Sequence, residues 1–328
     1  MKPTFHCRVV NGLFDDPVLY VRIIREGKAL LFDAGDIWAL NAREIHKIAH
    51  VFISHTHIDH FIGFDRLLRI LLRRIWPLYI YGPEGIIESI KGRLSGYTWN
   101  LIQEYPLEFY VQEVRPESIV TVRFSASEGF EPVQLYNREN SGIVYENELF
   151  HVKAEILDHG IPVLGFCLQE KEHLNVDPVR LKELSLPVGP WLGRLKEAIR
   201  TGNLTEDIPV TEQGKVVRAE DMLKQGVVKK TRGQRIAYVV DVAPTEDNID
   251  KIKALVSEAD LLYIEAYFLE EDRDRAVERR HLTASLAGRI AAEAKVKRVI
   301  PLHVSPKYKG REVEVIQEVQ QFYNMLKH

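Results

Sequence analysis

The feature that most constrains this chain is a cluster of metal-binding side chains between residues 54 and 60. It follows a strand-like run at residues 51–53, precedes a helical pattern, and consists of His55, His57, Asp59 and His60. Histidines at alternate positions point two ring nitrogens to one side of a loop, while the aspartate and the last histidine turn towards an adjacent point. The spacing predicts two neighbouring metal ions. The strand–loop–helix context favours this interpretation over a group of surface histidines or helix caps.

Short apolar runs alternate with longer helical patterns along the chain, which is typical of an α/β protein. Turn-forming residues divide the first strands into a β-meander at residues 5–10, 18–24 and 29–32. Further strands are expected at 78–81, over most of 97–150, and at 149–157, 236–240, 261–264 and 298–302. Helices are expected at 61–75, from 83, at 246–258, at 283–294 and from 312.

One segment breaks this regular alternation. Between residues 175 and 225, prolines and glycines separate short helical pieces, a pattern that marks turns. We interpret about 175–215 as an arm-like or inserted segment of a single domain that spans residues 1–328. An ordinary surface insertion is the alternative.

Composition limits the partners that the chain can have. Hydrophobic residues make up 45% of the 328 positions, and no apolar run approaches the about 20 residues that cross a bilayer. The N-terminus lacks the apolar segment of a secretion signal, so a cytoplasmic location without a membrane partner is expected. A formal net charge of −3 excludes a polycation, so any RNA contact must use local basic patches. Cys7 and Cys167 lie far apart in strand-like runs, which favours packed, reduced thiols.

Three more residues are candidates to complete a metal site, because each follows a strand-like run. These residues are His159, Asp241 and His303. Zinc in a catalytic site binds about three protein ligands plus water, and two adjacent ions usually share a carboxylate. Each residue alone could belong to an ordinary loop, but their common position at strand ends makes them ligand candidates.

Other motifs follow in a distinctive order along the chain. Residues 31–36 end a strand with Asp33, and residues 158–166 contain the second histidine. Residues 264–268, 281–284 and 302–308 then follow with Glu265, His281 and His303. Together these motifs resemble those of ribonuclease Z, the tRNA 3′-processing endonuclease family of the metallo-β-lactamase superfamily. Residues 186–196 are similar to the Gly-Pro motif of the arm with which that family grips the tRNA body.

The resemblance implies a metallo-β-lactamase fold, a four-layer αββα sandwich with an inserted arm-like segment. It assigns one metal to His55, His57 and His159, and a second to Asp59, His60 and His303. Asp241 would bridge the two ions. Zinc is expected, although a shell of histidine and aspartate also suits manganese or iron. A homodimer is implied as well.

The resemblance also implies roles in the reaction. His281 is expected to donate a proton to the leaving 3′ oxygen or to clamp a phosphate, with Glu265 orienting it. Asp59 would orient the attacking water in addition to binding metal. Simple burial of His281 beside a helix-capping Thr283 is the alternative.

Basic side chains after the metal loop and in the arm are candidate substrate contacts. They are Arg66, Arg69, Arg73, Arg74, Lys307, Arg194 and Lys196. Arginines on the helix after the loop would contact phosphates without reading sequence. A solvated helix face explains the same charges.

The sequence thus predicts a metal-dependent phosphodiesterase that removes 3′ trailers from precursor tRNA. The residues around Asp241 and the turn after His60 differ from the family pattern. An alternative therefore stays open, a hydrolase of a small phosphodiester or another ester on the same fold. A third possibility is a catalytically inactive RNA-binding homologue.

Overall fold

The computed structural model describes residues 4–24, 26–210 and 214–326. The chain divides into two compact units, one formed by residues 1–169 with 234–328 and the other by residues 170–233. The second unit encloses the segment expected as an insertion at about 175–215, of which residues 211–213 lie outside the described residues.

The first unit contains an eight-stranded sheet whose strands follow one another in chain order. The strands are β1 (Phe5–Val9), β2 (Leu19–Ile23), β3 (Lys28–Phe32), β4 (Ile48–Phe52), β5 (Leu78–Pro83), β6 (Glu108–Val114), β7 (Ser118–Ser125) and β8 (Pro132–Glu139). β1 to β3 form the expected antiparallel meander, and β3 to β6 are parallel. The helical pieces between the strands are α1 (Ala42–Lys47), α2 (Ile58–Phe61), α3 (Phe64–Leu71), α4 (Ile86–Ser95) and η1 (Ala126–Glu128).

The second sheet of this unit has six strands in the order β18-β17-β16-β11-β10-β9. Their bounds are β9 (Ile143–Glu146), β10 (Phe150–Asp158), β11 (Pro162–Glu170), β16 (Arg235–Val239), β17 (Leu261–Glu265) and β18 (Val299–Leu302). β16, β17 and β18 are parallel, so their carboxyl ends meet at one edge of the sheet. The helical pieces are α8 (Glu246–Val256), η2 (Glu270–Asp272), α9 (Arg273–Arg279), α10 (Ala284–Glu293), η3 (Pro306–Tyr308) and α11 (Glu312–Met325).

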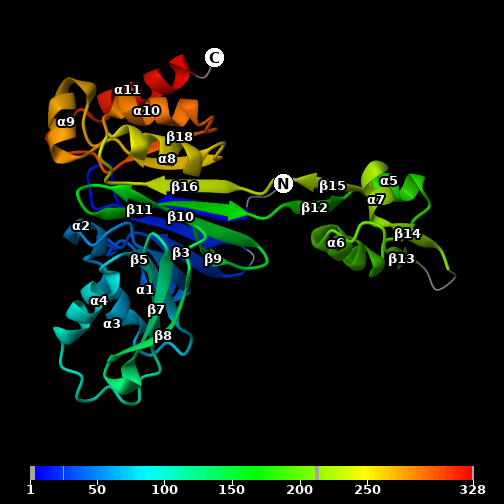
Figure 1. Ribbon diagram of the computed structural model, residues 1–328, viewed down its shortest axis with the longest axis horizontal. Helices are drawn as coiled ribbons and strands as arrows, with labels where there is room; N and C mark the ends of the chain where they lie inside the picture. The colour runs from blue at the N-terminus through cyan, green and yellow to red at the C-terminus, as the bar shows by residue number, and fades with distance from the viewer. Residues whose placement is uncertain (1–3, 25, 211–213, 327–328) are drawn as a thin grey trace. The chain divides into compact units, whose positions relative to one another are not determined.

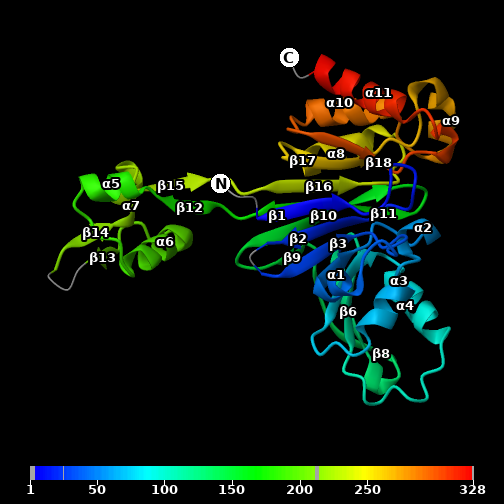
Figure 2. The same ribbon diagram turned by 180° about the vertical axis from the view of Figure 1, so that it is seen from behind.

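The two sheets pack face to face, and each is covered by helices on its other face (Figures 1 and 2). Alternate side chains of β16 show this directly. Ile236 and Tyr238 pack between the sheets, whereas Ala237 and Val239 face α8 and α10. A strand buried on both faces reads as a continuous apolar run, which is why residues 236–240 are hydrophobic throughout. The expected four-layer αββα arrangement is confirmed.

The expected helix at residues 61–75 is wrong in its bounds. The structure has two shorter helices there, α2 and α3, which are separated at Gly63. The Gly63 amide donates to the Ala34 carbonyl at 2.7 Å. A Cβ at position 63 would lie 2.3 Å from the Gly35 carbonyl oxygen. The loop after β3 therefore packs against the backbone at Gly63, and a continuous helix would not leave room for that contact.

The second unit has its own small core. β12 (His173–Val176) pairs antiparallel with β15 (Val228–Thr231), and β13 (Asp207–Pro209) pairs with β14 (Val216–Arg218). Its helices are α5 (Pro178–Glu183), α6 (Trp191–Thr201) and α7 (Ala219–Lys224). Trp191, Leu195 and Met222 are buried together in this core, so the Pro- and Gly-rich segment is a packed unit.

No helix within the described residues is both long and apolar enough to cross a membrane. The longest of those named above, α11, has 14 residues.

Gly63→Ala is expected to destabilise the protein, because the added Cβ meets the Gly35 carbonyl oxygen. The predicted loss is about 1–3 kcal/mol of unfolding free energy, as for other overpacked sites. Gly92→Ala is the matched control, since a Cβ in that exposed part of α4 has no neighbour within 4 Å. Urea unfolding measures both variants. A Gly63→Ala variant as stable as the Gly92→Ala variant would contradict this packing.

Candidate metal centre

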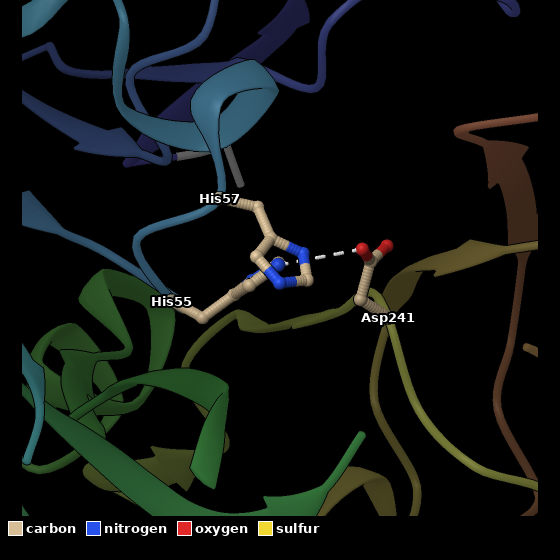
Figure 3. A group of neighbouring side chains, drawn as sticks. All are labelled: His55, His57 and Asp241. Carbon is tan, nitrogen blue, oxygen red and sulfur yellow. Dashed lines mark ion pairs between the residues drawn. The ribbon is translucent and has the colours of Figure 1, made fainter. Parts of the chain in front are cut away.

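The histidine loop joins β4 to α2. His57 occupies the N-cap position of α2 but makes no capping hydrogen bond, so its imidazole is free to point elsewhere. Figure 3 shows that His55 and His57 both extend from this loop towards the carboxylate of Asp241. His55 and His60 are fully buried, whereas His57 is exposed. A helix-capping role does not explain this arrangement.

Asp241 lies at the centre of the cluster, two residues beyond the end of β16. Its Oδ2 is 3.4 Å from Nε2 of His55, 3.4 Å from Nε2 of His60 and 3.8 Å from Nε2 of His159. Its Oδ1 is 2.6 Å from Nδ1 of His303. The Asp241 carboxylate therefore contacts imidazoles through both of its oxygens, as a carboxylate shared by two ions would.

Asp59 completes the side of the cluster that contains His303. Its Oδ2 is 3.3 Å from Nε2 of His303 and 3.5 Å from Nε2 of His60. Asp59, His60 and His303 form one group whose ligand atoms could hold an ion, and His55, His57 and Asp241 form another. The structure thus brings together the seven residues that the sequence analysis selected as ligands.

His159 follows β10 and is oriented by the backbone of a distant segment. Its Nδ1 donates to the Arg280 carbonyl oxygen at 2.7 Å, so its Nε2 is left to face Asp241. Fixing one ring nitrogen in this way sets the tautomer of a metal ligand.

Several buried polar atoms of the cluster have no hydrogen-bond partner among the described residues. They are Nε2 of His55 and Nε2 of His60, together with Oδ1 of Asp241 and Nδ1 of His303, which lie 2.6 Å apart but are not aligned as a hydrogen bond. Buried polar atoms are normally paired, so unpaired atoms that converge on one point need a partner of another kind. Imidazole nitrogens and carboxylate oxygens are ligands of divalent transition metals. The residues present therefore fit divalent metal ions.

The charges of the cluster match this chemistry. Burial lowers the pKa of His55 to about 2, and the nearby His60 contributes in the same direction, so His55 is neutral. Burial would also lower the pKa of His303, but the carboxylates of Asp241 and Asp59 raise it to about 9. Burial raises the pKa of Asp241, yet His303 and His60 bring it well below its ordinary value. The cluster favours positive charge, and metal binding would displace protons from its imidazoles.

Asp33 lies next to the cluster and contacts one of its histidines, His60. It was not among the predicted site residues. Its Oδ2 accepts hydrogen bonds from the Tyr238 hydroxyl and the Ser54 hydroxyl, both at 2.8 Å. The same oxygen lies 2.8 Å from Nδ1 of His60, which leaves Nε2 of His60 facing Asp59 and Asp241. The signal that could have identified Asp33 is its position directly after a buried strand, like that of Asp241 and His303.

Three residues that follow strands in this site have an unfavourable backbone conformation. Asp33, Asp241 and His303 all have a left-handed backbone, with φ of 55°, 51° and 51°. Such conformations are costly for residues other than glycine, and they concentrate at functional sites. Each one turns the chain sharply at the strand end, where the side chains converge.

His281 and Glu265 lie beside the cluster. Glu265 ends β17 and is fully buried, and its Oε2 is 2.8 Å from Nδ1 of His281. Its Oε1 accepts from the backbone amide of Val242 at 2.8 Å. His281 also contacts His159, with ring centroids 4.8 Å apart. Thr283 does cap α10, but the Glu265 bond and the contact with His159 direct His281 towards the cluster.

The predicted substrate contacts fall into two groups. Arg69 and Arg73 are exposed, and Arg66 is partly buried with its guanidinium 4.0 Å from the Trp38 ring centroid. Arg74 is only 3% exposed and donates to the Ile48 carbonyl at 2.6 Å. Arg74 is therefore not available to contact substrate, because its guanidinium is buried and bound to the backbone of β4.

Two of the other three predicted contacts have protein partners. Lys307 forms an ion pair with Asp272. Arg194 lies on α6 in the second unit, where it is exposed and donates to the Pro209 carbonyl at 3.1 Å. Lys196, on the same helix, is partly exposed.

Comparison with known proteins places this site in a family. Ribonuclease Z of Deinococcus radiodurans is 30% identical over 284 residues, which cover 85% of this chain and 83% of the relative. Ribonuclease Z of Bacillus cereus is 30% identical over 310 residues, which cover 91% and 85%. The chain belongs to the ribonuclease Z family. This membership confirms the resemblance drawn from the motif order.

The fold has independent support. A family model described as a beta-lactamase superfamily domain matches residues 199–304, a range that includes Asp241, Glu265 and His303. The crystal structure of the short form of human tRNase Z aligns with a TM-score of 0.53 at 20% identity and covers 93% of both chains. Together with family membership, these findings confirm the predicted metallo-β-lactamase fold. They also confirm the prediction that the protein is a metal-dependent hydrolase and a nuclease.

Asp33→Asn is expected to weaken divalent metal binding about 10- to 100-fold, because a ligand loses the carboxylate that orients it. In this variant, Nδ1 of His60 would face an amide group where it now faces the Asp33 carboxylate. Competition with a chromogenic chelator measures the affinity. Asp36→Asn, at an exposed position of the same loop, is the control. Equal affinities of the two variants would contradict a supporting role for Asp33.

Proposed function

We propose that this protein is an endoribonuclease that removes 3′ trailers from precursor tRNA. The observation that carries the proposal is the pairing of the His/Asp cluster with His281, which is held by a buried glutamate at the edge of that cluster. Membership of the ribonuclease Z family supports the choice of RNA as substrate.

In the proposed site, His55, His57 and His159 would hold one ion, and Asp59, His60 and His303 would hold the other. Asp241 would be shared, because its carboxylate contacts His55 and His159 of the first set as well as His60 and His303 of the second. Zinc is the proposed metal, and manganese or iron would suit the same nitrogen and oxygen ligands.

Two divalent ions bound here would supply an activated water and stabilise negative charge on the phosphate. Asp59, which is partly exposed, would orient that water. Attack of the water oxygen on phosphorus breaks the bond to the 3′ oxygen. The products are a tRNA with a 3′ hydroxyl and a trailer with a 5′ phosphate.

His281 is the proposed proton donor to the leaving 3′ oxygen. Its Nδ1 is bound by Glu265, so Nε2 is the nitrogen available to substrate. Glu265 in turn is fixed by the backbone amides of Val242 and Leu282, at 2.8 Å and 3.2 Å. A buried carboxylate with this many partners keeps the imidazole in one tautomer.

The second unit is proposed to bind the tRNA body. Its own core makes it a separate folded element, and it carries Arg194 and Lys196 on one helix. Arg69 and Arg73 on and after α3 are proposed as phosphate contacts. A homodimer and a cytoplasmic location belong to the same proposal.

Removing the second unit tests the choice of substrate. Gln169 and Arg235 are register partners on β11 and β16, so a two-residue Asn-Gly turn in place of residues 170–234 would close a hairpin. This variant is expected to lose at least about 100-fold in cleavage of precursor tRNA, since it loses the proposed contacts to the RNA body. Cleavage of bis(p-nitrophenyl) phosphate should persist. If the intact protein cleaves only the small ester, the tRNA assignment is wrong.

His281→Ala tests the proton donor. The turnover of precursor tRNA is expected to fall about 10²- to 10⁴-fold, the usual contribution of a general acid. Cleavage of bis(p-nitrophenyl) phosphate should change little, because its leaving group departs as a stable anion. His46→Ala, at an exposed position in α1, is the control and should retain both activities. Equal losses on both substrates would argue against proton donation by His281.

A further inference from the structure

Tyr267 lies two residues beyond β17, and its ring lies flat against the imidazole of His281. The two ring centroids are 3.9 Å apart, and the ring planes differ by 8°. The same phenol ring meets the imidazole of His303 edge on, with centroids 5.1 Å apart and planes at 67°. Tyr267 therefore contacts both the proposed proton donor and a proposed metal ligand.

The backbone around Tyr267 is fixed on both sides. The Ala266 amide donates to the Leu302 carbonyl at 3.1 Å, and the Tyr267 carbonyl accepts from the Ser305 amide at 3.0 Å. On the other side, the Phe268 carbonyl accepts from the Ala284 amide at 2.7 Å. These bonds tie Tyr267 to the segments that carry His303 and His281. The position of its ring relative to both histidines is thus set by the fold.

Glu265 alone does not fix the imidazole of His281. Its 2.8 Å bond to Nδ1 restrains one nitrogen, but a single hydrogen bond tolerates small rotations of the imidazole about its Cβ–Cγ bond. The second side-chain torsion of histidine is broad, so rotamer preference adds little restraint. A flat aromatic neighbour removes this freedom, because tilting the imidazole would overlap one side of the stack and open a gap on the other.

We propose that Tyr267 is a positioning residue for His281. The stack holds the imidazole plane so that Nε2 points at the leaving 3′ oxygen, while Glu265 sets the tautomer. The phenol hydroxyl has no part in this role, since the ring face alone makes the contact. The inference rests on the proposed function, because it assigns a geometry to the proton donor of that reaction.

Tyr267→Ala and Tyr267→Phe separate the ring from the hydroxyl. The alanine variant is expected to lose about 10- to 100-fold in kcat on precursor tRNA, as a misplaced catalytic group does, with KM unchanged. The phenylalanine variant should retain wild-type kcat. Both should cleave bis(p-nitrophenyl) phosphate at the wild-type rate, since that leaving group needs no proton. Tyr136→Ala, on the exposed strand β8, is the matched control and should match the wild type on both substrates.

A spectroscopic measurement tests the stack without any activity. In protein with isotope-labelled histidine, the Tyr267 ring should shift the His281 ring protons upfield. That shift should persist in Tyr267→Phe and disappear in Tyr267→Ala.

The proposal is overturned if Tyr267→Ala cleaves precursor tRNA at the wild-type rate, or if it loses both activities equally. An unchanged His281 shift in Tyr267→Ala also overturns it. If the wild-type protein cleaves no precursor tRNA, the proposed function fails, and the His281 shift alone then decides whether Tyr267 positions the imidazole.

Discussion

The site depends on one buried carboxylate, that of Asp241. It is 3% exposed and faces imidazoles of His55, His60, His159 and His303. A carboxylate removed from water is costly unless positive charge and hydrogen bonds compensate for it. Here, imidazoles surround it, and Nε2 of His55 and Nε2 of His60 have no hydrogen-bond partner within the described residues. The arrangement is stable as a cation-binding site, which is why the cluster indicates metal more firmly than any single histidine does.

The stacking of two sheets brings these ligands together. His55 and His57 come from the loop after β4 in the first sheet, and Asp59 and His60 come from α2, which follows that loop. Asp241 and His303 follow strands of the second sheet. Asp33 links the two layers, because its Oδ2 binds Tyr238 of the second sheet and lies beside His60 of the first. The aromatic core between the sheets, including Phe32, Phe52 and Phe166, sets their separation. The ligands therefore come together only when the two sheets are packed against each other.

Much of this could be predicted from sequence, since strand ends and histidine spacing are local signals. The meander, the alternation after residue 236 and the seven ligand candidates depend on such signals. The break at Gly63 could not be predicted, because it arises from a backbone contact with the distant loop at Ala34 and Gly35. Arg74 looked like its basic neighbours, and only tertiary burial distinguishes it. The stacking of Tyr267 on His281 could not be predicted although residues 264–268 form one of the motifs, because this contact exists only once β17 and the segment before α10 lie together.

Anomalous diffraction from crystals grown with zinc tests the central claim most directly. Two anomalous peaks per chain are predicted, each about 2.0–2.2 Å from an oxygen of Asp241, the usual distance between zinc and a carboxylate. One peak should lie near Nε2 of His55 and the other near the His303 ring. A single peak, or peaks remote from Asp241, would contradict a two-metal site built around this carboxylate.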